Sequence, residues 1–156
     1  MSTFFDYPGG EGDRRGDDNV CFAGLSPVDW ERLVAATERR RFAAGDVVMG
    51  LGEAERSLYL IATGTVEVFV GDADAGTERS VRVQGPGSVL GEVAFFDGRP
   101  RSASVRALSS GEVLRLSEVA FDGLAGRHPD LARKILVDLG RILALRLRQA
   151  EARDAT

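Results

Sequence analysis

The chain has 156 residues, a formal net charge of −4, 44% hydrophobic residues and 28% charged residues, which suits one globular domain with a buried core. It contains no run of about 18 apolar residues that could cross a bilayer, and its acidic balance does not favour nucleic acid or an anionic membrane as a partner. Its single cysteine, Cys21, cannot form an internal disulfide, and the N-terminus lacks a secretion signal. We therefore expect a cytoplasmic protein.

Residues 1–20 are rich in glycine and acidic residues and show little hydrophobic periodicity, which predicts a disordered tail. The folded domain should then occupy residues 21–156. Its first helix is expected after Ser26, because Ser26 suits an N-cap, Pro27 suits the first helical position and Asp29 completes a capping box. Apolar residues at helical spacing follow, namely Trp30, Leu33 and Val34.

Between this helix and residue 116 the sequence changes to short runs of strand-forming residues that glycines separate. Seven of these runs are expected to be strands: 39–43, 47–49, 58–63, 65–70, 80–84, 102–107 and 113–116. Many short strands joined by tight turns are typical of an antiparallel barrel. We therefore predict a mainly β fold with flanking helices, in the form of a β-roll or jelly-roll barrel.

Two helices should follow the strands. The first is expected over 117–124, and Pro129 then opens a long C-terminal helix that runs to about residue 150. The long helix carries two apolar rows: Leu131, Ile135, Leu139 and Ile142 in one, and Leu136, Gly140, Leu143 and Leu147 in the other. Two rows exceed the need of a single buried face, so we expect the surplus to support a homodimer, with a wider core contact as the alternative.

The most informative motif runs from Gly91 into the predicted strand 102–107. Gly91 and Glu92 open a short apolar stretch, and Arg101, Ser102 and Ala103 follow it after a glycine and proline break. A helical turn beginning at Gly91 would point free backbone N–H groups at an anion. The planar guanidinium of Arg101 matches two phosphate oxygens, and ionised Glu92 can only accept hydrogen bonds, as from a ribose hydroxyl. These residue types predict a site for a sugar phosphate.

Together with Val93 and Ala94, these residues resemble the phosphate-binding cassette of the cyclic nucleotide-binding domain family, in which Gly-Glu-aliphatic-Ala precedes Arg-small-Ala. The stretches 42–47, 58–68 and 85–91 are similar to earlier strands and turns of that family, in the same order, and the resemblance covers about residues 22–150. It is a resemblance to the catabolite-activator and protein-kinase-regulatory-subunit type, as a stand-alone bacterial member without an output domain. The implied fold is a β-roll with a short phosphate-binding helix and a long C-terminal helix.

The resemblance implies a cyclic nucleotide as the ligand, with no other cofactor and no metal. Arg101 would bind the phosphate and Glu92 the ribose 2′-hydroxyl, while Val93 and Ala94 would contribute backbone N–H groups. A hydroxyl at the position of Ser102 accompanies either base in the family, and we expect cAMP rather than cGMP. The resemblance further implies pocket walls at Val81, Val83, Val89 and Leu90, and a lid formed by Ile142, Leu143 and Arg146.

We expect a regulatory module rather than an enzyme, because the only histidine, His128, cannot supply the ligand set of a metal-binding barrel and no nucleophile motif is present. The module would bind its nucleotide and signal through the C-terminal helix to an unidentified downstream protein. The chain ends at Thr156, about where a helix-turn-helix would begin, so we expect no direct DNA binding. The alternative is a protein-interaction module that keeps the fold and has lost the ligand.

Overall fold

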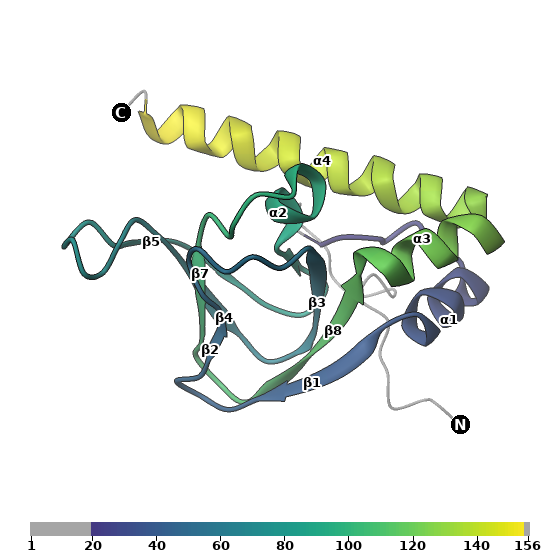
Figure 1. The fold of residues 1–156 in the computed structure, drawn as a ribbon, viewed down its shortest axis with the longest axis horizontal. Coiled ribbons are helices and arrows are strands. Elements are labelled where there is room, and N and C mark those ends of the chain that lie inside the picture. Colours follow the sequence, from purple (N-terminus) through teal and green to yellow (C-terminus); the bar gives the residue numbers. More distant parts are fainter. Residues whose placement is uncertain (1–19, 155–156) are drawn as a thin grey trace.

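The computed structural model describes residues 20–154, a β-roll with helices packed along one side (Figure 1). Helix α1 (Pro27–Ala35) precedes the strands, the short helix α2 (Glu92–Asp97) interrupts them, and α3 (Glu118–Arg127) and α4 (Pro129–Asp154) follow. This order confirms the predicted mainly β fold with flanking helices. The disordered tail predicted over 1–20 lies, apart from Val20, outside the described residues.

Among the described residues, eight strands form two four-stranded sheets in which all hydrogen-bonded neighbours are antiparallel. The first sheet has the order β1 (Glu38–Phe42), β8 (Gly111–Ser117), β3 (Ser57–Thr63) and β6 (Val89–Leu90). The second has the order β2 (Val47–Met49), β7 (Ser104–Ala107), β4 (Val66–Val70) and β5 (Arg79–Gln84). The short, glycine-separated runs therefore pair as an antiparallel roll, as predicted.

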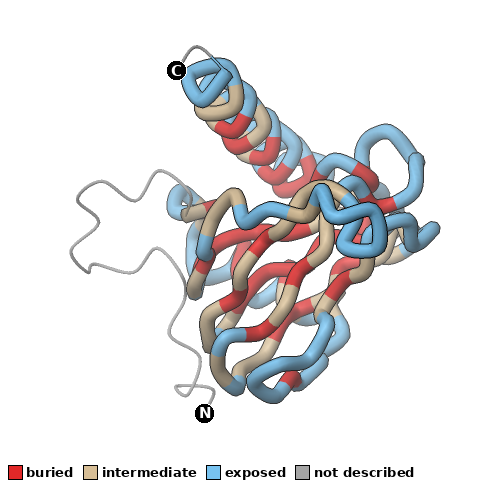
Figure 2. Tube along the Cα trace, turned by 90° about the vertical axis from the view of Figure 1, so that its left-hand side faces the viewer, coloured by how far each residue is buried: buried red, intermediate tan, exposed pale blue. Residues whose placement is uncertain are grey.

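Strand β3 joins two hydrophobic cores. Its residues Leu58 and Leu60 pack among the helices, whereas Tyr59 and Ile61 point into the roll. Because successive side chains of a strand point to opposite faces, a sheet covered by helices on one side and by the second sheet on the other is buried on both faces. Figure 2 shows the result as buried bands that cross the strands and continue along one side of α4.

Helix α1 is fixed at its start by the predicted capping box. Asp29 N donates to Ser26 Oγ (3.1 Å), and Ser26 N donates to the Asp29 carboxylate (3.3 Å). Lys134 Nζ on α4 lies 2.9 Å from the same carboxylate, and this hydrogen bond holds the pKa of Asp29 below its usual value. The cap of α1 is therefore also a link between α1 and α4.

One of the two predicted apolar rows of α4 is buried. Leu131, Ile135, Leu139 and Ile142 belong to the helix-side core, whereas Leu136, Gly140 and Leu147 are exposed and Leu143 is half-buried. The second row consequently lies largely at the surface of the domain. Within residues 20–154, neither α4 nor any other helix has the apolar length that a membrane span requires.

Residues 20–22, which we call the N-terminal strap, connect the middle of α4 to the turn before β6. Three hydrogen bonds hold the strap: Cys21 N to Gly87 O (2.8 Å), Phe22 N to the Asp138 carboxylate, and Arg141 Nη2 to Val20 O (2.7 Å). Phe22 has a φ of 65°, a left-handed conformation that non-glycine residues rarely adopt.

One strand was not predicted, and several others begin or end one or two residues away from their predicted bounds. Strand β6 was not predicted, because its two residues lie between glycine-containing turns and are too few to show periodicity. The strand predicted over 102–107 begins at Ser104 instead. The backbone of Arg101 is bonded instead to the loop before β3: its N donates to Glu53 O (2.8 Å) and its O accepts from Gly52 N (2.9 Å). The chain therefore joins the sheet only after these two bonds, at Ser104.

Candidate functional site

A cavity of about 330 Å³ opens between the second sheet, α2 and α4. All seven residues of the predicted cassette line it: Gly91, Glu92, Val93, Ala94, Arg101, Ser102 and Ala103. Its volume lies at the lower end of the range typical of small-molecule sites. Apolar side chains of β4, β7 and α4 complete the wall, namely Val68, Val70, Val105, Leu143 and Leu147.

Gly91 makes the turn from β6 into α2 possible. Its φ is 79°, and a Cβ built there would lie 2.4 Å from Arg101 Nη1 and 2.9 Å from Ser57 O. Both the backbone conformation and the close approach of Arg101 therefore require glycine. No side chain caps α2, which leaves its first backbone N–H groups at the cavity without helical partners.

Arg101 is buried, with 3% of its surface exposed, and two backbone carbonyl groups accept hydrogen bonds from its guanidinium. Nη1 donates to Gly91 O and Nη2 to Ser57 O, each at 3.1 Å. Nε has no hydrogen-bond partner among the described residues. A buried charged group that keeps an unused donor is costly unless a further partner satisfies that donor.

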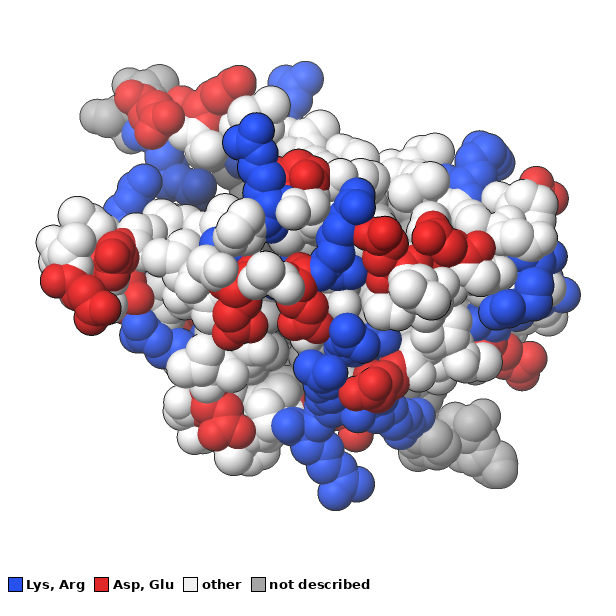
Figure 3. All heavy atoms as spheres, in the orientation of Figure 1, with Lys and Arg blue, Asp and Glu red and all other residues white. Residues whose placement is uncertain are grey.

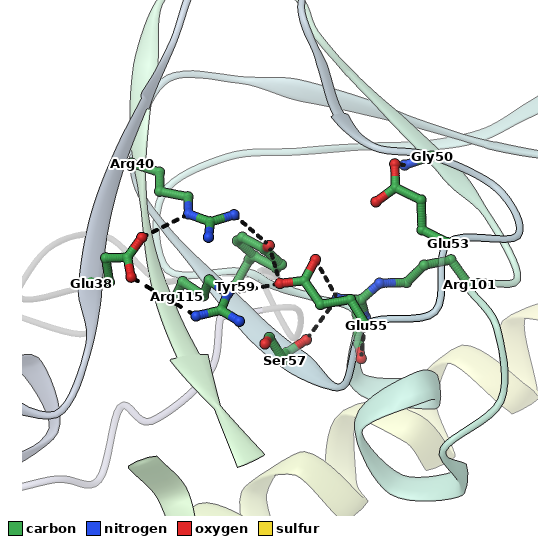
Figure 4. A network of polar contacts seen from close by, with 10 residues as sticks. Glu38, Arg40, Gly50, Glu53, Glu55, Ser57, Tyr59, Arg101 and Arg115 are labelled. Atoms are coloured by element: carbon green, nitrogen blue, oxygen red, sulfur yellow. Dashed lines mark hydrogen bonds and ion pairs between the residues drawn. The ribbon is translucent and has the colours of Figure 1, made fainter. Parts of the chain in front are cut away.

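A polar network on the far side of Arg101 supports it (Figure 4). Glu55 Oε1 accepts hydrogen bonds from Tyr59 Oη (2.8 Å) and Arg115 Nε (2.7 Å), and Glu55 Oε2 lies 3.8 Å from Arg101 Nη2. Arg40 Nη1 donates to the same Tyr59 hydroxyl (3.1 Å). Burial alone would raise the pKa of Glu55, but the hydrogen bonds from Arg115 and Tyr59 outweigh it and lower that pKa.

Glu92 at the start of α2 is also buried and pairs with a residue of α4. Its carboxylate forms an ion pair with Arg146, whose Nη2 donates to Val89 O at 3.0 Å. Arg82 of β5 lines the same part of the cavity. Burial, followed by repulsion from Arg146, lowers the pKa of Arg82 to about 10. This end of the cavity therefore combines one carboxylate with two arginines.

The predicted wall and lid agree with the cavity in part. Leu90, Leu143 and Arg146 line it, whereas Val81, Val83, Val89 and Ile142 do not. Val89 and Ile142 belong to the helix-side core, and Val81 packs against the interior core. Val83 is 57% exposed because it lies opposite Glu67 on the outer face of the second sheet.

The sequence analysis missed the apolar lining residues Met49, Val68, Val70, Val105 and Leu147 and one charged one, Arg82. Arg82 pairs with Val68, whose side chain points into the roll, so Arg82 points inward as well. Its place between two valines favours the wrong face, since alternation puts the two valines on one face of the strand and Arg82 on the other. The irregular register between Val68 and Phe69 hides which of the two faces is inward.

The lining of this cavity combines hydrogen-bond donors with an acceptor. It presents guanidinium and backbone N–H donors and one buried carboxylate acceptor. Over residues 20–154, no group of three or more His, Cys, Asp and Glu side chains is arranged to hold a metal ion. Figure 3 shows basic and acidic side chains interspersed over the face seen in Figure 1.

Comparison with known proteins identifies relatives of the whole domain. The chain is 33% identical over 130 residues to the cyclic AMP receptor protein of Thermus thermophilus, covering 83% of this chain and 58% of the relative. It is 30% identical over 112 residues to the cAMP-dependent protein kinase regulatory subunit of Emericella nidulans, covering 72% of this chain and 26% of the relative. The chain thus spans less than two thirds of these relatives.

The fold and the sequence profile agree with these relatives. The crystal structure of a cyclic nucleotide-binding domain from Methylobacillus flagellatus superimposes with a TM-score of 0.76 at 28% identity, covering 83% of this chain and 72% of that chain. The profile of the cyclic nucleotide-binding domain matches residues 39–128, more than half of the chain and the whole cassette. The chain belongs to the cyclic nucleotide-binding domain family.

Proposed function

We propose that the cavity binds a cyclic nucleotide, cAMP in preference to cGMP, and that the domain is a regulatory module. The observation that carries the proposal is that Arg101, a buried donor, and Glu92, a buried acceptor, line the same cavity. A cyclic nucleotide offers the complementary groups, an anionic phosphate and a ribose hydroxyl. A protein-interaction module without a ligand would have no use for this pair.

The phosphate would bind between Arg101 and the first backbone N–H groups of α2. Arg101 Nε is the donor without a partner, and the α2 N–H groups lie at the same wall of the cavity. Glu92 would accept a hydrogen bond from the ribose 2′-hydroxyl. Each charge-assisted hydrogen bond contributes about 1.5–3 kcal/mol, so both are needed for tight binding.

The preference for cAMP is supported by the relatives, because the two curated ones named above are a cyclic AMP receptor protein and a cAMP-dependent kinase subunit. The base would lie against Leu143, a half-buried residue of α4 in the lining of the cavity. Nucleotide binding would then change the position of α4 and pass the signal to a downstream protein. We further propose that the exposed row of α4, which includes Leu136 and Leu147, forms a homodimer contact.

Thermal unfolding in the presence of cAMP, cGMP and 5′-AMP tests this function. A ligand at 100 times its dissociation constant adds about 2.7 kcal/mol, which raises the Tm of a chain of this length by about 6–10 °C. We expect the largest shift with cAMP, a smaller one with cGMP and none with 5′-AMP. The absence of any shift at millimolar concentrations would reject nucleotide binding and favour the interaction module.

A further inference from the structure

Arg56, the residue just before β3, binds the C-terminal end of the short helix α2. Its Nε donates a hydrogen bond to Phe95 O at 2.9 Å, and its Nη2 donates one to Phe96 O at 3.2 Å. Both carbonyl groups belong to the last turn of α2, where the backbone carbonyls of a helix have no helical partner and a cation is favourable. Arg56 therefore caps α2 at the end away from Gly91.

The same arginine is bound to the start of α3. Nη1 of Arg56 lies 2.8 Å from the Glu118 carboxylate, and Glu118 N donates to Arg56 O at 3.1 Å. The guanidinium therefore has partners on two helices. A planar group with donors in fixed directions suits such an arrangement, whereas the ammonium of a lysine is a single point charge. Arg56 thus joins α2, α3 and the start of β3.

The next residue, Ser57, binds Arg101. Its carbonyl oxygen accepts a hydrogen bond from Arg101 Nη2 at 3.1 Å (Figure 4), and Ser57 is 1% exposed. Ser57 is also the first residue of β3, which is paired with β8 on one side and β6 on the other. Two adjacent residues therefore hold both elements of the proposed phosphate site. The side chain of Arg56 holds α2, and the carbonyl of Ser57 holds the guanidinium of Arg101.

Apolar packing also holds α2 but does not fix its direction. Phe95 belongs to the helix-side core, and its ring meets the Phe121 ring edge-on, with 5.5 Å between the centroids. Hydrophobic contact of this kind is non-directional. The hydrogen bonds from Arg56 are directional, and they act on the backbone of α2. The orientation of the α2 axis toward Arg101 therefore depends on Arg56.

We propose that Arg56 is a positioning residue for the nucleotide phosphate. It orients α2 so that the first backbone N–H groups of the helix and the guanidinium of Arg101 point at the same anion. Arg56 is not part of the cavity lining, so its effect on the nucleotide passes through α2. Without Arg56 the phosphate keeps Arg101 and loses the aligned N–H donors. This inference rests on the nucleotide site proposed above.

The experiment compares the wild-type chain with Arg56→Met, Arg56→Lys and the control Arg99→Met. Arg99 is exposed and lies just beyond the end of α2. Isothermal titration calorimetry gives the dissociation constant of cAMP, and phosphorus NMR gives the chemical shift of the bound phosphate. Amide hydrogen exchange follows residues 92–98 in the nucleotide-free chain.

We expect Arg56→Met to weaken cAMP binding about tenfold, which corresponds to the loss of one charge-assisted hydrogen bond. The phosphorus signal of bound cAMP should shift, and residues 92–98 should exchange faster. Arg56→Lys should restore neither the affinity nor the phosphorus signal, because one ammonium cannot reproduce the contacts with both helices. Arg99→Met should match the wild type in all three measurements. A role confined to stability would lower the Tm of Arg56→Met and leave the phosphorus signal unchanged.

Wild-type affinity and an unshifted phosphorus signal in folded Arg56→Met would overturn the positioning role, and so would full rescue by Arg56→Lys. If cAMP binds no chain, the wild type included, the proposed function fails and the positioning role fails with it. Faster exchange over 92–98 would then identify Arg56 as a structural cap alone.

Should Arg56→Met not fold, Glu118→Gln keeps the guanidinium and removes the charge of its partner on α3, a side chain that is 42% exposed. This variant should shift the phosphorus signal of bound cAMP and weaken binding by about two- to threefold. An unchanged signal and affinity in Glu118→Gln would reject the proposal.

Discussion

The carboxylate of Glu55, in the loop before β3, lies next to the guanidinium of Arg101 in the cavity. Their closest oxygen and nitrogen are 3.8 Å apart, and Arg101 lies over the Tyr59 ring at 5.7 Å from its centroid. Because Tyr59 and Arg115 hold Glu55 by hydrogen bonds, the charge behind Arg101 is preorganised before any ligand arrives.

Glu55→Gln should destabilise the fold by about 1–3 kcal/mol at pH 7, because Arg115 loses a charge-assisted partner and Arg101 loses a neighbouring charge. The pKa of Glu55 is lowered in the folded state, so its contribution is present above the unfolded pKa of about 4.3 and is lost as the pH falls through the folded pKa. Urea unfolding at pH 7, 5 and 3 gives the free energy of unfolding of both proteins, and the difference between wild type and variant should be smaller at pH 3. A difference that is constant with pH would show that the charge of Glu55 contributes nothing to stability.

Arg101→Leu should weaken cAMP binding by about 10- to 100-fold, since it removes a charge-assisted contact worth about 1.5–3 kcal/mol. Isothermal titration calorimetry measures the loss. The matched control is Arg99→Leu, which alters an exposed arginine in the same loop between α2 and β7. Unaltered binding by folded Arg101→Leu would mean that the phosphate is held elsewhere.

Gly91→Ala should cost at least about 1–2 kcal/mol of stability, because alanine resists the left-handed backbone conformation and its Cβ would clash with Ser57 O. The clash with Arg101 Nη1 should also displace the guanidinium and weaken cAMP binding. Gly126→Ala serves as the control, since a Cβ at Gly126 in α3 meets nothing within 4 Å. Chemical denaturation of the two variants, followed by titration with cAMP, separates the effect on the fold from the effect on the site.

Leu136→Asp combined with Leu147→Asp should convert a dimer to a monomer without loss of the fold, because these side chains are 39% and 60% exposed in the isolated domain. Sedimentation velocity at micromolar concentration measures the change. Val119→Asp on α3, where the side chain is 81% exposed, controls for a general effect of added charge. A wild-type chain that sediments as a monomer at all concentrations would contradict the proposed dimer contact.

The order of elements and the cassette could be predicted from the sequence, because both depend on local spacing. Gly91, Glu92 and Arg101 lie close together in the chain, and the turn at Gly91 brings them to one cavity. The Glu92–Arg146 pair could not be predicted in the same way, since only the packing of α4 brings these distant residues together. Arg82 was missed because an irregular register on β4 hides which side of β5 points inward.

The N-terminal strap gives α4 a pivot. It is hydrogen-bonded to the helix at Asp138 and Arg141. At a rise of 1.5 Å per residue, Arg146 lies about 7–8 Å and Asp154 about 20 Å along the axis beyond Arg141. If α4 turns about this point, a movement of about 1 Å at Arg146 becomes about 2–3 Å at the end of the helix by simple leverage. A small displacement of the helix in the cavity would therefore become a larger one at its far end.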